Sequence, residues 1–384
     1  MTAQSLKVMT ILGTRPEIIR LSRVMDRLER YCDHVLVHTG QNYDYELNEV
    51  FFNDLGVKQP DYFLGVDTSS LGTTVAGILL ETEKVLHKEQ PDAVLILGDT
   101  NSAISSYIAR RMKIPVYHME AGNRCFDRNV PEETNRKLVD HIADFNLVYT
   151  EHARRNLIAE GLQARRIYLT GSPMREVLEH YKPCIMSSSI LSELELTERG
   201  YLLVSVHREE NVDNPQNLSE LVASFNALAE IYNCRLIIST HPRTRKRLEN
   251  LNDIKPDSRL EWMKPFGFHD YNRLQVSAKC VVSDSGTIAE ESSILNFPAV
   301  TPRFSIERPE AMDTGAIIAC GLNADSIVRS VETVIDQFNN EKTEAEKKSF
   351  VPEDYCIENT AQRVVNLIIG TAKLSNAWDG IENP

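Results

Sequence analysis

The sequence predicts an α/β protein built from two doubly wound parallel-sheet domains. Short apolar runs alternate with longer stretches of helical period along all 384 residues, a pattern typical of parallel sheets covered on both faces. About six candidate strands fall in each half, which fits two open sheets better than one eight-stranded barrel. Two apolar runs, Lys7–Leu12 and Cys280–Val282, lead into turns of small residues, Gly13–Glu17 and Ser283–Glu291. Such turns expose backbone N–H groups that bind anions, so we expect two domains that face a shared ligand.

Each candidate strand is a short apolar run, and the runs are spaced widely enough for helices between them. In the first half the candidate strands are Val8–Leu12, Val35–His38, Ala93–Leu97, Val116–Met119, Leu147–Tyr149 and Ile167–Leu169. In the second half they are Tyr201–Val206, Arg235–Ser239, Leu260–Trp262, Cys280–Val282, Ala299–Thr301 and Ala316–Ala319. The helical period is clearest over Ile18–Glu29, Gly77–His87 and Leu218–Ile231.

The boundary between the domains is expected in a linker over Ser172–Ser189. This segment contains Pro173 and Pro183 and ends in three consecutive serines. The last helical stretch, about Glu358–Lys373, is expected to cross back to the first domain. The sequence therefore predicts a first domain over residues 1–173 plus about 358–384, and a second domain over residues 174–357.

Composition and charge exclude several classes of protein. The net charge of −13 argues against a general nucleic-acid binder, which would carry a basic face. No apolar run approaches the roughly 20 residues of a membrane span, and the first residues lack the layout of a signal peptide. The seven cysteines are dispersed, with no Cys-x-x-Cys. We therefore expect a cytoplasmic protein with reduced, buried thiols and neither a disulfide framework nor a zinc site.

Polar residues follow many of the candidate strands, at the sheet edge where parallel sheets bind their ligands. These segments are Gly98-Asp99-Thr100, Glu120–Arg124, His207–Glu210, His241-Pro242-Arg243 and Ser283–Gly286, with a helix start at Pro131–Arg136. Each has a structural explanation alone: Asp99 can cap a helix, Glu132 and Glu133 can complement a helix dipole, and His207 and Arg15 can be solvated. Together, three carboxylates, a histidine and several arginines predict a cleft that binds a diphosphate and moves protons beside it.

Three absent motifs narrow the chemistry further. No Gly-x-Gly-x-x-Gly follows the first strand, which disfavours NAD chemistry, and no Gly-x-x-x-x-Gly-Lys-Ser/Thr of a Walker-type NTPase is present. Histidines and carboxylates nowhere show His-Glu-x-x-His or similar metal spacing. We therefore expect no cofactor and no metal, and chemistry carried out by side chains and substrate alone.

Seven motifs occur in a fixed order along the chain. They are Gly13-Thr-Arg-Pro-Glu17, Gly98-Asp-Thr100, Glu120-Ala-Gly122 with Arg124, Pro131-Glu-Glu133 with Asn135-Arg136, His207-Arg208, Asp284-Ser-Gly286 with Glu290-Glu291, and Glu307-Arg-Pro-Glu310. With these motifs the chain resembles the non-hydrolysing UDP-N-acetylglucosamine 2-epimerases over nearly its whole length. The resemblance implies a glycosyltransferase-B-type fold of two Rossmann-like domains, an active site in the interdomain cleft, no cofactor, and a homodimer.

A narrower resemblance concerns the substrate. The segments Ile18–Val24, Gly40–Tyr45, Asn123–Asp127, Ser205–Asn211 and Thr240–Arg245 are similar to the branch that makes UDP-N-acetyl-L-fucosamine for capsule or O-antigen. Enzymes specific for N-acetylglucosamine carry lysine in place of Arg20 and usually glycine in place of Thr287, and they lack Asn123 and Cys125-Phe126. This resemblance implies UDP-2-acetamido-2,6-dideoxy-L-talose as substrate. The alternative is conversion of UDP-N-acetylglucosamine to UDP-N-acetylmannosamine.

The resemblance also implies roles for individual residues. UDP leaves C1 as the C2 proton is lost, which gives a glycal, and UDP then adds back while a proton arrives on the opposite face of C2. The family positions for the catalytic groups match Asp99, Glu120 and Glu132, with His207 near the phosphates. The remaining substrate and UDP contacts would be Arg15, Arg20, Arg124, His241, Ser285, Gly286, Glu291 and Arg308. Cys125 and Phe126 are expected to offer apolar surface to a sugar methyl.

Two hypotheses from other functional classes are also compatible with the sequence. A glycosyltransferase of the same fold would move the sugar to an acceptor, and a UDP-sugar sensor would only bind it. A transferase needs one base and an open acceptor side, whereas this chain carries three acids at separate strand ends. Only an epimerase would introduce solvent deuterium at C2.

Overall fold

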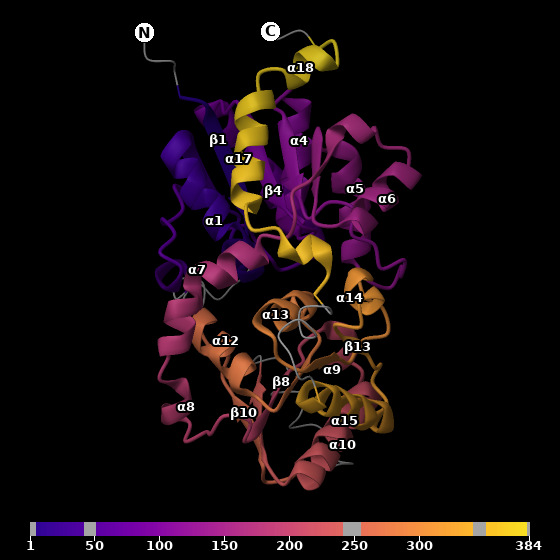
Figure 1. The fold of residues 1–384 in the computed structure, drawn as a ribbon. Coiled ribbons are helices and arrows are strands. Elements are labelled where there is room, and N and C mark those ends of the chain that lie inside the picture. Colours follow the sequence, from indigo (N-terminus) through magenta and orange to yellow (C-terminus); the bar gives the residue numbers. More distant parts are fainter. Residues whose placement is uncertain (1–4, 42–50, 241–254, 341–350, 382–384) are drawn as a thin grey trace. The chain divides into compact units, whose positions relative to one another are not determined.

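The computed structural model describes residues 5–41, 51–240, 255–340 and 351–381. The chain divides into two compact units, residues 1–179 with 353–384, and residues 180–352 (Figure 1). Each unit contains one open sheet of parallel strands with helices on both faces. The α/β fold class expected from the sequence is therefore confirmed.

The first unit is built around a seven-stranded sheet in the order β3-β2-β1-β4-β5-β6-β7. Its neighbouring strands are all parallel, with pairs such as Val8 opposite His34 and Val94 opposite Val116. The strands are β1 (Lys7–Leu12), β2 (Asp33–His38), β3 (Tyr62–Phe63), β4 (Ala93–Leu97), β5 (Val116–Met119), β6 (Phe145–Val148) and β7 (Ile167–Leu169).

Helices cover both faces of this first sheet. Apolar residues of α3, α4 and α5 pack with Met9, Ile11 and Val94 on one face. On the other face α17 lies beside α1 (Figure 1), and Tyr117 of β5 reaches Thr371 at the end of α17 with a 2.6 Å hydrogen bond. The helices are α1 (Arg15–Tyr31), α3 (Leu71–Glu89), α4 (Ser106–Arg111), α5 (Glu132–Ile142), α6 (Glu151–Ala159), α17 (Thr360–Thr371) and α18 (Ser375–Trp378), with short 3₁₀ turns at Asn101–Ser105, Ala164–Arg166 and Glu353–Cys356.

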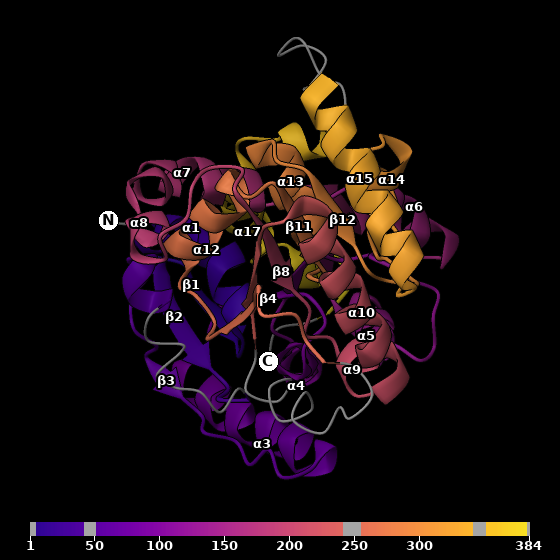
Figure 2. The ribbon, with the colours of Figure 1, turned by 90° about the horizontal axis from the view of Figure 1, so that it is seen from below.

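The second unit repeats the plan with a six-stranded sheet in the order β10-β9-β8-β11-β12-β13. One face packs against α10 and α15, which lie side by side in Figure 2, and the other packs against α8, α12 and α13. The strands are β8 (Tyr201–Ser205), β9 (Arg235–Ser239), β10 (Leu260–Met263), β11 (Cys280–Ser283), β12 (Ala299–Thr301) and β13 (Ile318–Ala319). The helices are α8 (Ile190–Glu193), α9 (Glu209–Val212), α10 (Pro215–Tyr232), α12 (Phe268–Ser277), α13 (Ile288–Leu295), α14 (Glu310–Asp313) and α15 (Ala324–Asn340).

The boundary between the two units falls after Glu179, inside the expected linker Ser172–Ser189. The segment is not an irregular linker, however, because α7 (Met174–Ser187) runs through most of it with Pro183 inside the helix. Val177, Leu178, Tyr181 and Ile185 are all buried, and this spacing places them along one helical face. Burial of that face is worth more than the hydrogen bond that proline removes.

Two smaller expectations also need correction. The strand β3 was not expected, and it adds to the sheet through only two residues beside β2. The cysteines are free thiols, but Cys184 and Cys356 are exposed rather than buried. None of the helices in the described part of the chain is both long and apolar enough to span a membrane.

Candidate functional site

The first group of candidate residues lies at the carboxyl ends of β1, β4 and β5, which are neighbours in the first sheet. Glu17, in the first turn of α1, joins two of the turns found there. Its carboxylate accepts hydrogen bonds from Gly13 N at 3.0 Å, from Thr14 Oγ1 at 2.8 Å and from Thr100 Oγ1 at 3.1 Å. Burial raises the pKa of Glu17 to about 7 against the opposing effect of these hydrogen bonds. The turns after β1 and β4 are therefore tied together through one buried carboxyl group.

Glu120, the first residue after β5, is ion-paired with Arg20 of α1. Both side chains are 12% exposed, so the pair is largely shielded but still accessible from solvent. Asn123 Nδ2 lies 3.4 Å from the other carboxylate oxygen of Glu120. The structure thus brings together two of the residues expected at the site, although they are 100 positions apart in the sequence.

Asp99, which follows β4, is held by α5. Arg136 donates from Nε to Asp99 Oδ2 at 2.7 Å and from Nη1 to Glu133 Oε2 at 3.0 Å. Asn135 donates from Nδ2 to the backbone oxygen of Asp99 at 2.9 Å. Arg136 was not among the candidate site residues, although it stands in the quoted motif one helical turn beyond Glu132, a spacing that could have indicated it.

The two acids at the start of α5 differ in their surroundings. Glu133 is buried, and its carboxylate is paired with Arg136. Glu132, the expected catalytic residue, is exposed at the first position of the helix. The described contacts therefore connect Asp99 and Glu120 to arginines and leave Glu132 on the surface of the first unit.

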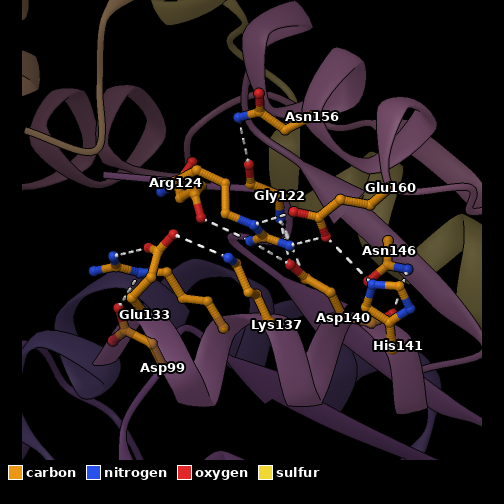
Figure 3. A network of polar contacts seen from close by, with 12 residues as sticks. Asp99, Gly122, Arg124, Glu133, Lys137, Asp140, His141, Asn146, Asn156 and Glu160 are labelled. Atoms are coloured by element: carbon orange, nitrogen blue, oxygen red, sulfur yellow. Dashed lines mark hydrogen bonds and ion pairs between the residues drawn. The ribbon is translucent and has the colours of Figure 1, made fainter. Parts of the chain in front are cut away.

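Arg124 does not have the surroundings of a ligand-binding residue. Its side chain is 0% exposed and ion-paired at 2.7 Å with both Asp140 and Glu160 (Figure 3). Nη1 also donates to the backbone oxygen of Asn123 at 2.8 Å. The expectation that Arg124 contacts UDP is corrected on this ground, because its guanidinium is buried and already committed to neighbouring oxygens.

The loop after Arg124 also differs from expectation in one residue. The thiol of Cys125 lies 3.4 Å from Glu133 Oε2 and 3.6 Å from Arg136 Nη1. It therefore belongs to the polar network around Asp99 and does not offer apolar surface to a methyl group. Phe126 is 75% exposed, so its ring is accessible on the surface.

The second group of candidate residues lies at the carboxyl ends of β8 and β11, which are adjacent in the second sheet. Asp284 is buried there and accepts hydrogen bonds from the backbone of His207 and of Arg208 at 2.9–3.1 Å. The ring nitrogen Nδ1 of His207 lies 3.2 Å from Asp284 Oδ1, while the His207 side chain is 52% exposed. Asp284 stands in one of the seven motifs but was not among the candidate site residues, yet its carboxylate orients the exposed histidine.

Ser285 and Gly286 form the turn that leads into α13. Ser285 Oγ lies 3.0 Å from Thr287 Oγ1, which in turn donates to Glu291 Oε1 at 2.7 Å. The second oxygen of Glu291 accepts a 2.6 Å hydrogen bond from Gln275. Glu291 therefore links the turn before α13 to Gln275 of α12.

The remaining candidate residues are placed as follows. Arg308 forms a buried 2.9 Å ion pair with Glu290. Arg15 is the first residue of α1, and its guanidinium lies 5.5 Å from the centre of the Phe51 ring. His241 lies outside the described residues. Among the residues that are described, no group of three His, Cys, Asp or Glu side chains is arranged to hold a metal ion.

Known proteins resemble this chain over most of its length. Residues 26–369 match the family model for UDP-N-acetylglucosamine 2-epimerase. The structure of UDP-N-acetylglucosamine 2-epimerase from Rickettsia bellii is 44% identical, with a TM-score of 0.89 and coverage of 97% of this chain and 98% of that chain. A UDP-GlcNAc 2-epimerase from Methanocaldococcus jannaschii, solved in complex with UDP-GlcNAc and UDP, is 34% identical, with a TM-score of 0.87 and coverage of 95% and 100%.

A relative with a different named substrate is also similar. The UDP-2,3-diacetamido-2,3-dideoxy-D-glucuronate 2-epimerase of Pseudomonas aeruginosa is 33% identical over 333 residues, which are 85% of this chain and 92% of that protein. The structural matches confirm the glycosyltransferase-B-type fold class. The chain therefore belongs to the UDP-N-acetylglucosamine 2-epimerase family and is an isomerase.

Proposed function

We propose that this protein epimerises C2 of a UDP-2-acetamido sugar by eliminating and re-adding UDP, without a cofactor. The observation that carries the proposal is the placement of Asp99 and Glu120 at the ends of adjacent strands, each paired with an arginine. Removal of a proton from one face of a carbon and its return to the other face require two acid–base groups, held by different parts of the chain.

The proposed reaction follows from the weak acidity of the C2 proton. No carbonyl group stabilises a carbanion at C2, so one carboxylate removes the proton while the electron pair forms the C1–C2 double bond. The C1–O bond breaks at the same time, and UDP leaves with the bonding electrons. In the second half of the reaction, UDP adds back to C1 of the glycal while an acid delivers a proton to the opposite face of C2. Asp99, Glu120 and Glu132 are proposed for these proton transfers.

The leaving diphosphate gains charge and needs hydrogen-bond donors and cations. The proposal assigns this task to Arg15, His207 and the Ser285-Gly286 turn. The exposed ring of His207 and its anchoring by Asp284 support that assignment. Glu291 is proposed to hold the ribose hydroxyls, and Arg20, His241 and Arg308 remain proposed contacts of the substrate. UDP and the UDP-sugar are the proposed small-molecule partners, and a homodimer is the proposed assembly.

The finer proposal is that the substrate is UDP-2-acetamido-2,6-dideoxy-L-talose and the product UDP-N-acetyl-L-fucosamine, for capsule or O-antigen synthesis. It rests on the motifs around Arg20 and Asn123–Asp127, and on the exposed ring of Phe126 as apolar surface for a methyl group. The relative that acts on a diacetamido sugar supports a range of substrates within the family. Conversion of UDP-N-acetylglucosamine to UDP-N-acetylmannosamine is the second candidate, and it is supported by the similarity to the UDP-N-acetylglucosamine 2-epimerases of Rickettsia bellii and Methanocaldococcus jannaschii.

The test compares both sugar nucleotides in D₂O by NMR. Deuterium should enter C2 of the L-talose derivative as UDP-N-acetyl-L-fucosamine forms, and UDP-N-acetylglucosamine should react slowly or not at all. Efficient conversion of UDP-N-acetylglucosamine with the L-sugar untouched would instead select the second candidate. A glycosyltransferase or a sensor would leave C2 protonated in both sugars.

A further inference from the structure

A buried histidine–aspartate pair lies close to the turns that carry Asp99 and Glu120, and no step of the proposed reaction uses it. His118 is on β5 and Asp140 is on α5, with side chains 1% and 0% exposed. His118 Nδ1 lies 2.9 Å from Asp140 Oδ1. Because neither side chain reaches the surface, any effect of the pair on a substrate must pass through the groups that it holds.

His118 holds the turn before Asp99. Its second ring nitrogen, Nε2, lies 2.8 Å from the backbone oxygen of Gly98. A carbonyl oxygen only accepts hydrogen bonds, so this contact requires a proton on Nε2. Gly98 has a φ of +72°, in the left-handed region that favours glycine. The imidazole thus fixes the carbonyl group next to Asp99, at a point where the chain turns sharply.

Asp140 holds the turn after Glu120. The amide of Gly122 lies 3.2 Å from both of its carboxylate oxygens. Glu120 has a φ of +64°, which is uncommon for a residue with a side chain and persists only where the surroundings impose it. The hydrogen bond from Gly122 to Asp140 is one of the contacts that impose it.

Asp140 is held in turn by Arg124, which donates to Oδ2 at 2.7 Å and is itself paired with Glu160 (Figure 3). Asp140 also follows Arg136 by four positions on α5, so both lie on one face of that helix. Arg136 reaches Asp99, and Asp140 reaches the turn after Glu120. One face of α5 therefore contacts both acid-bearing turns.

We propose that His118 and Asp140 are positioning residues that fix the carboxylates of Asp99 and Glu120 relative to each other. This inference rests on the proposed function, because it takes these two carboxylates as the groups that exchange protons with C2. It adds that their spacing depends on a polar network that never touches the sugar. Loss of the network should lower kcat without weakening the binding of UDP.

The experiment uses two variants of His118 and a matched control in the full-length protein. His118→Leu removes the donor to Gly98, whereas His118→Gln keeps an N–H group that can reach the same oxygen. His34→Leu is the control, because His34 is another buried histidine of the same sheet, with Nε2 2.9 Å from Thr10 Oγ1. Each variant is assayed for kcat, KM, UDP affinity by calorimetry, and Tm.

We expect His118→Leu to lower kcat by about 10- to 100-fold, the scale of a small misplacement of catalytic groups. UDP affinity should stay within about two-fold, because no contact to the nucleotide is lost. His118→Gln should recover most of kcat, and His34→Leu should keep it with a comparable fall in Tm. A kcat for folded His118→Leu within about two-fold of the wild type, or one that falls no further than in His34→Leu, overturns the inference.

A crystal structure of His118→Leu tests the positioning separately from the reaction. We expect the Gly98–Thr100 turn and the Asp99 carboxylate to shift relative to Glu120 in this variant. An unchanged turn would overturn the inference. If the wild-type protein epimerises no UDP-2-acetamido sugar, the proposed function fails. The crystal structure then still decides whether His118 fixes the turn.

Discussion

Arg20 reaches Glu120 from α1, and Arg136 reaches Asp99 from α5. Each arginine belongs to a different helix, so the two carboxylates are supported independently. The exposed fractions of 12% for Glu120 and 27% for Asp99 leave both groups open to a ligand. At the scale of single residues, the arrangement holds two acids in place without burying them.

Replacement of the proposed acids should therefore impair chemistry more than binding. Asp99→Asn, Glu120→Gln and Glu132→Gln should each lower kcat by at least ~10²-fold, the usual contribution of a general acid or base. UDP affinity should be largely kept. Glu151→Gln is the control, because Glu151 also begins a helix and is 42% exposed. Near-normal turnover in any one of the three would remove that residue from the proton-transfer step.

The raised pKa of Glu17 predicts how the stability of the protein changes with pH. Its pKa in the folded protein is raised by burial from 4.5 to about 7. Between these values the folded chain holds a proton that the unfolded chain has released, so the free energy of unfolding contributed by Glu17 decreases as pH rises. Glu17→Gln removes this titration and should gain on the order of 3 kcal/mol relative to the wild type between pH 5 and pH 8.

Urea unfolding at the two pH values measures that difference. Glu151→Gln again serves as the control, because it makes the same change from glutamate to glutamine at a partly exposed position. An equal offset between Glu17→Gln and the wild type at pH 5 and pH 8 would contradict the assignment of a raised pKa to Glu17.

Sequence reasoning found the residues at the strand ends but not their partners. Asp99, Glu120 and His207 could be predicted because each lies within two residues of the end of an apolar run. Arg136 and Asp284 were not assigned a role from the sequence, because their contacts lie across the fold. Asp284, for example, accepts hydrogen bonds from residues 76 and 77 positions away. Arg124 was misassigned for the same reason, since nothing in its local sequence shows that its guanidinium is buried.

At the scale of elements, the turn between β5 and the loop before α5 depends on close packing at Gly122. Gly122 has a φ of +81°, and a Cβ atom there would lie 2.4 Å from the backbone oxygen of Ala153 in α6. Backbone atoms of a helix cannot move aside as the end of a flexible side chain can. Both conformation and space therefore require glycine at this position.

The contribution of space can be separated from that of conformation by a matched pair of substitutions. Gly161 has a similar φ of +89° but no atom within 4 Å of the added Cβ. Gly161→Ala should cost about 1–2 kcal/mol for the left-handed backbone. Gly122→Ala should cost about 1–3 kcal/mol more, because it also overpacks the contact with α6. Chemical denaturation compares the two, and equal losses would show that the contact with α6 has no effect.

Element boundaries were predictable where a single periodicity dominates. Ala93–Leu97, Val116–Met119 and Arg235–Ser239 form strands with the expected bounds, because each is a compact apolar run. The helix α7 escaped because two prolines and a serine run suggested a break, whereas its buried face decided the outcome. The strand β3 escaped because two residues carry no periodic pattern.

At the scale of the whole molecule, fold class was the most secure prediction. Alternation of strands and helices is spread over hundreds of residues, so one unexpected helix or one missed strand does not change the predicted fold class. The ion pairs of the candidate site cannot be predicted in this way, because each depends on one contact and not on a repeated pattern. The pairing of Arg20 with Glu120 spans 100 positions, and only the closed fold brings such groups together.

The last prediction concerns the stability of the protein in acid, and it depends on His34 and His38, two buried histidines of β2. Burial lowers the pKa of His34 to about 3 and that of His38 to about 4. His38 Nδ1 accepts a 3.0 Å hydrogen bond from the amide of Gly40, so the ring must be neutral. Below pH 6.5 the unfolded chain binds protons that these rings cannot take up, so the free energy of unfolding falls as pH falls. By pH 5 each histidine should contribute a loss of about 2 kcal/mol.

His38→Gln keeps a hydrogen-bond acceptor but cannot titrate, so it should lose up to about 2 kcal/mol less than the wild type between pH 7.5 and pH 5. His87→Gln is the control, because His87 is exposed on α3. The opposite contribution of Glu17 is present in the wild type and in both variants, so it cancels in the comparison. Urea unfolding followed by circular dichroism gives the three differences. An acid sensitivity of His38→Gln equal to that of the wild type and of His87→Gln would mean that protonation of His38 does not destabilise the fold.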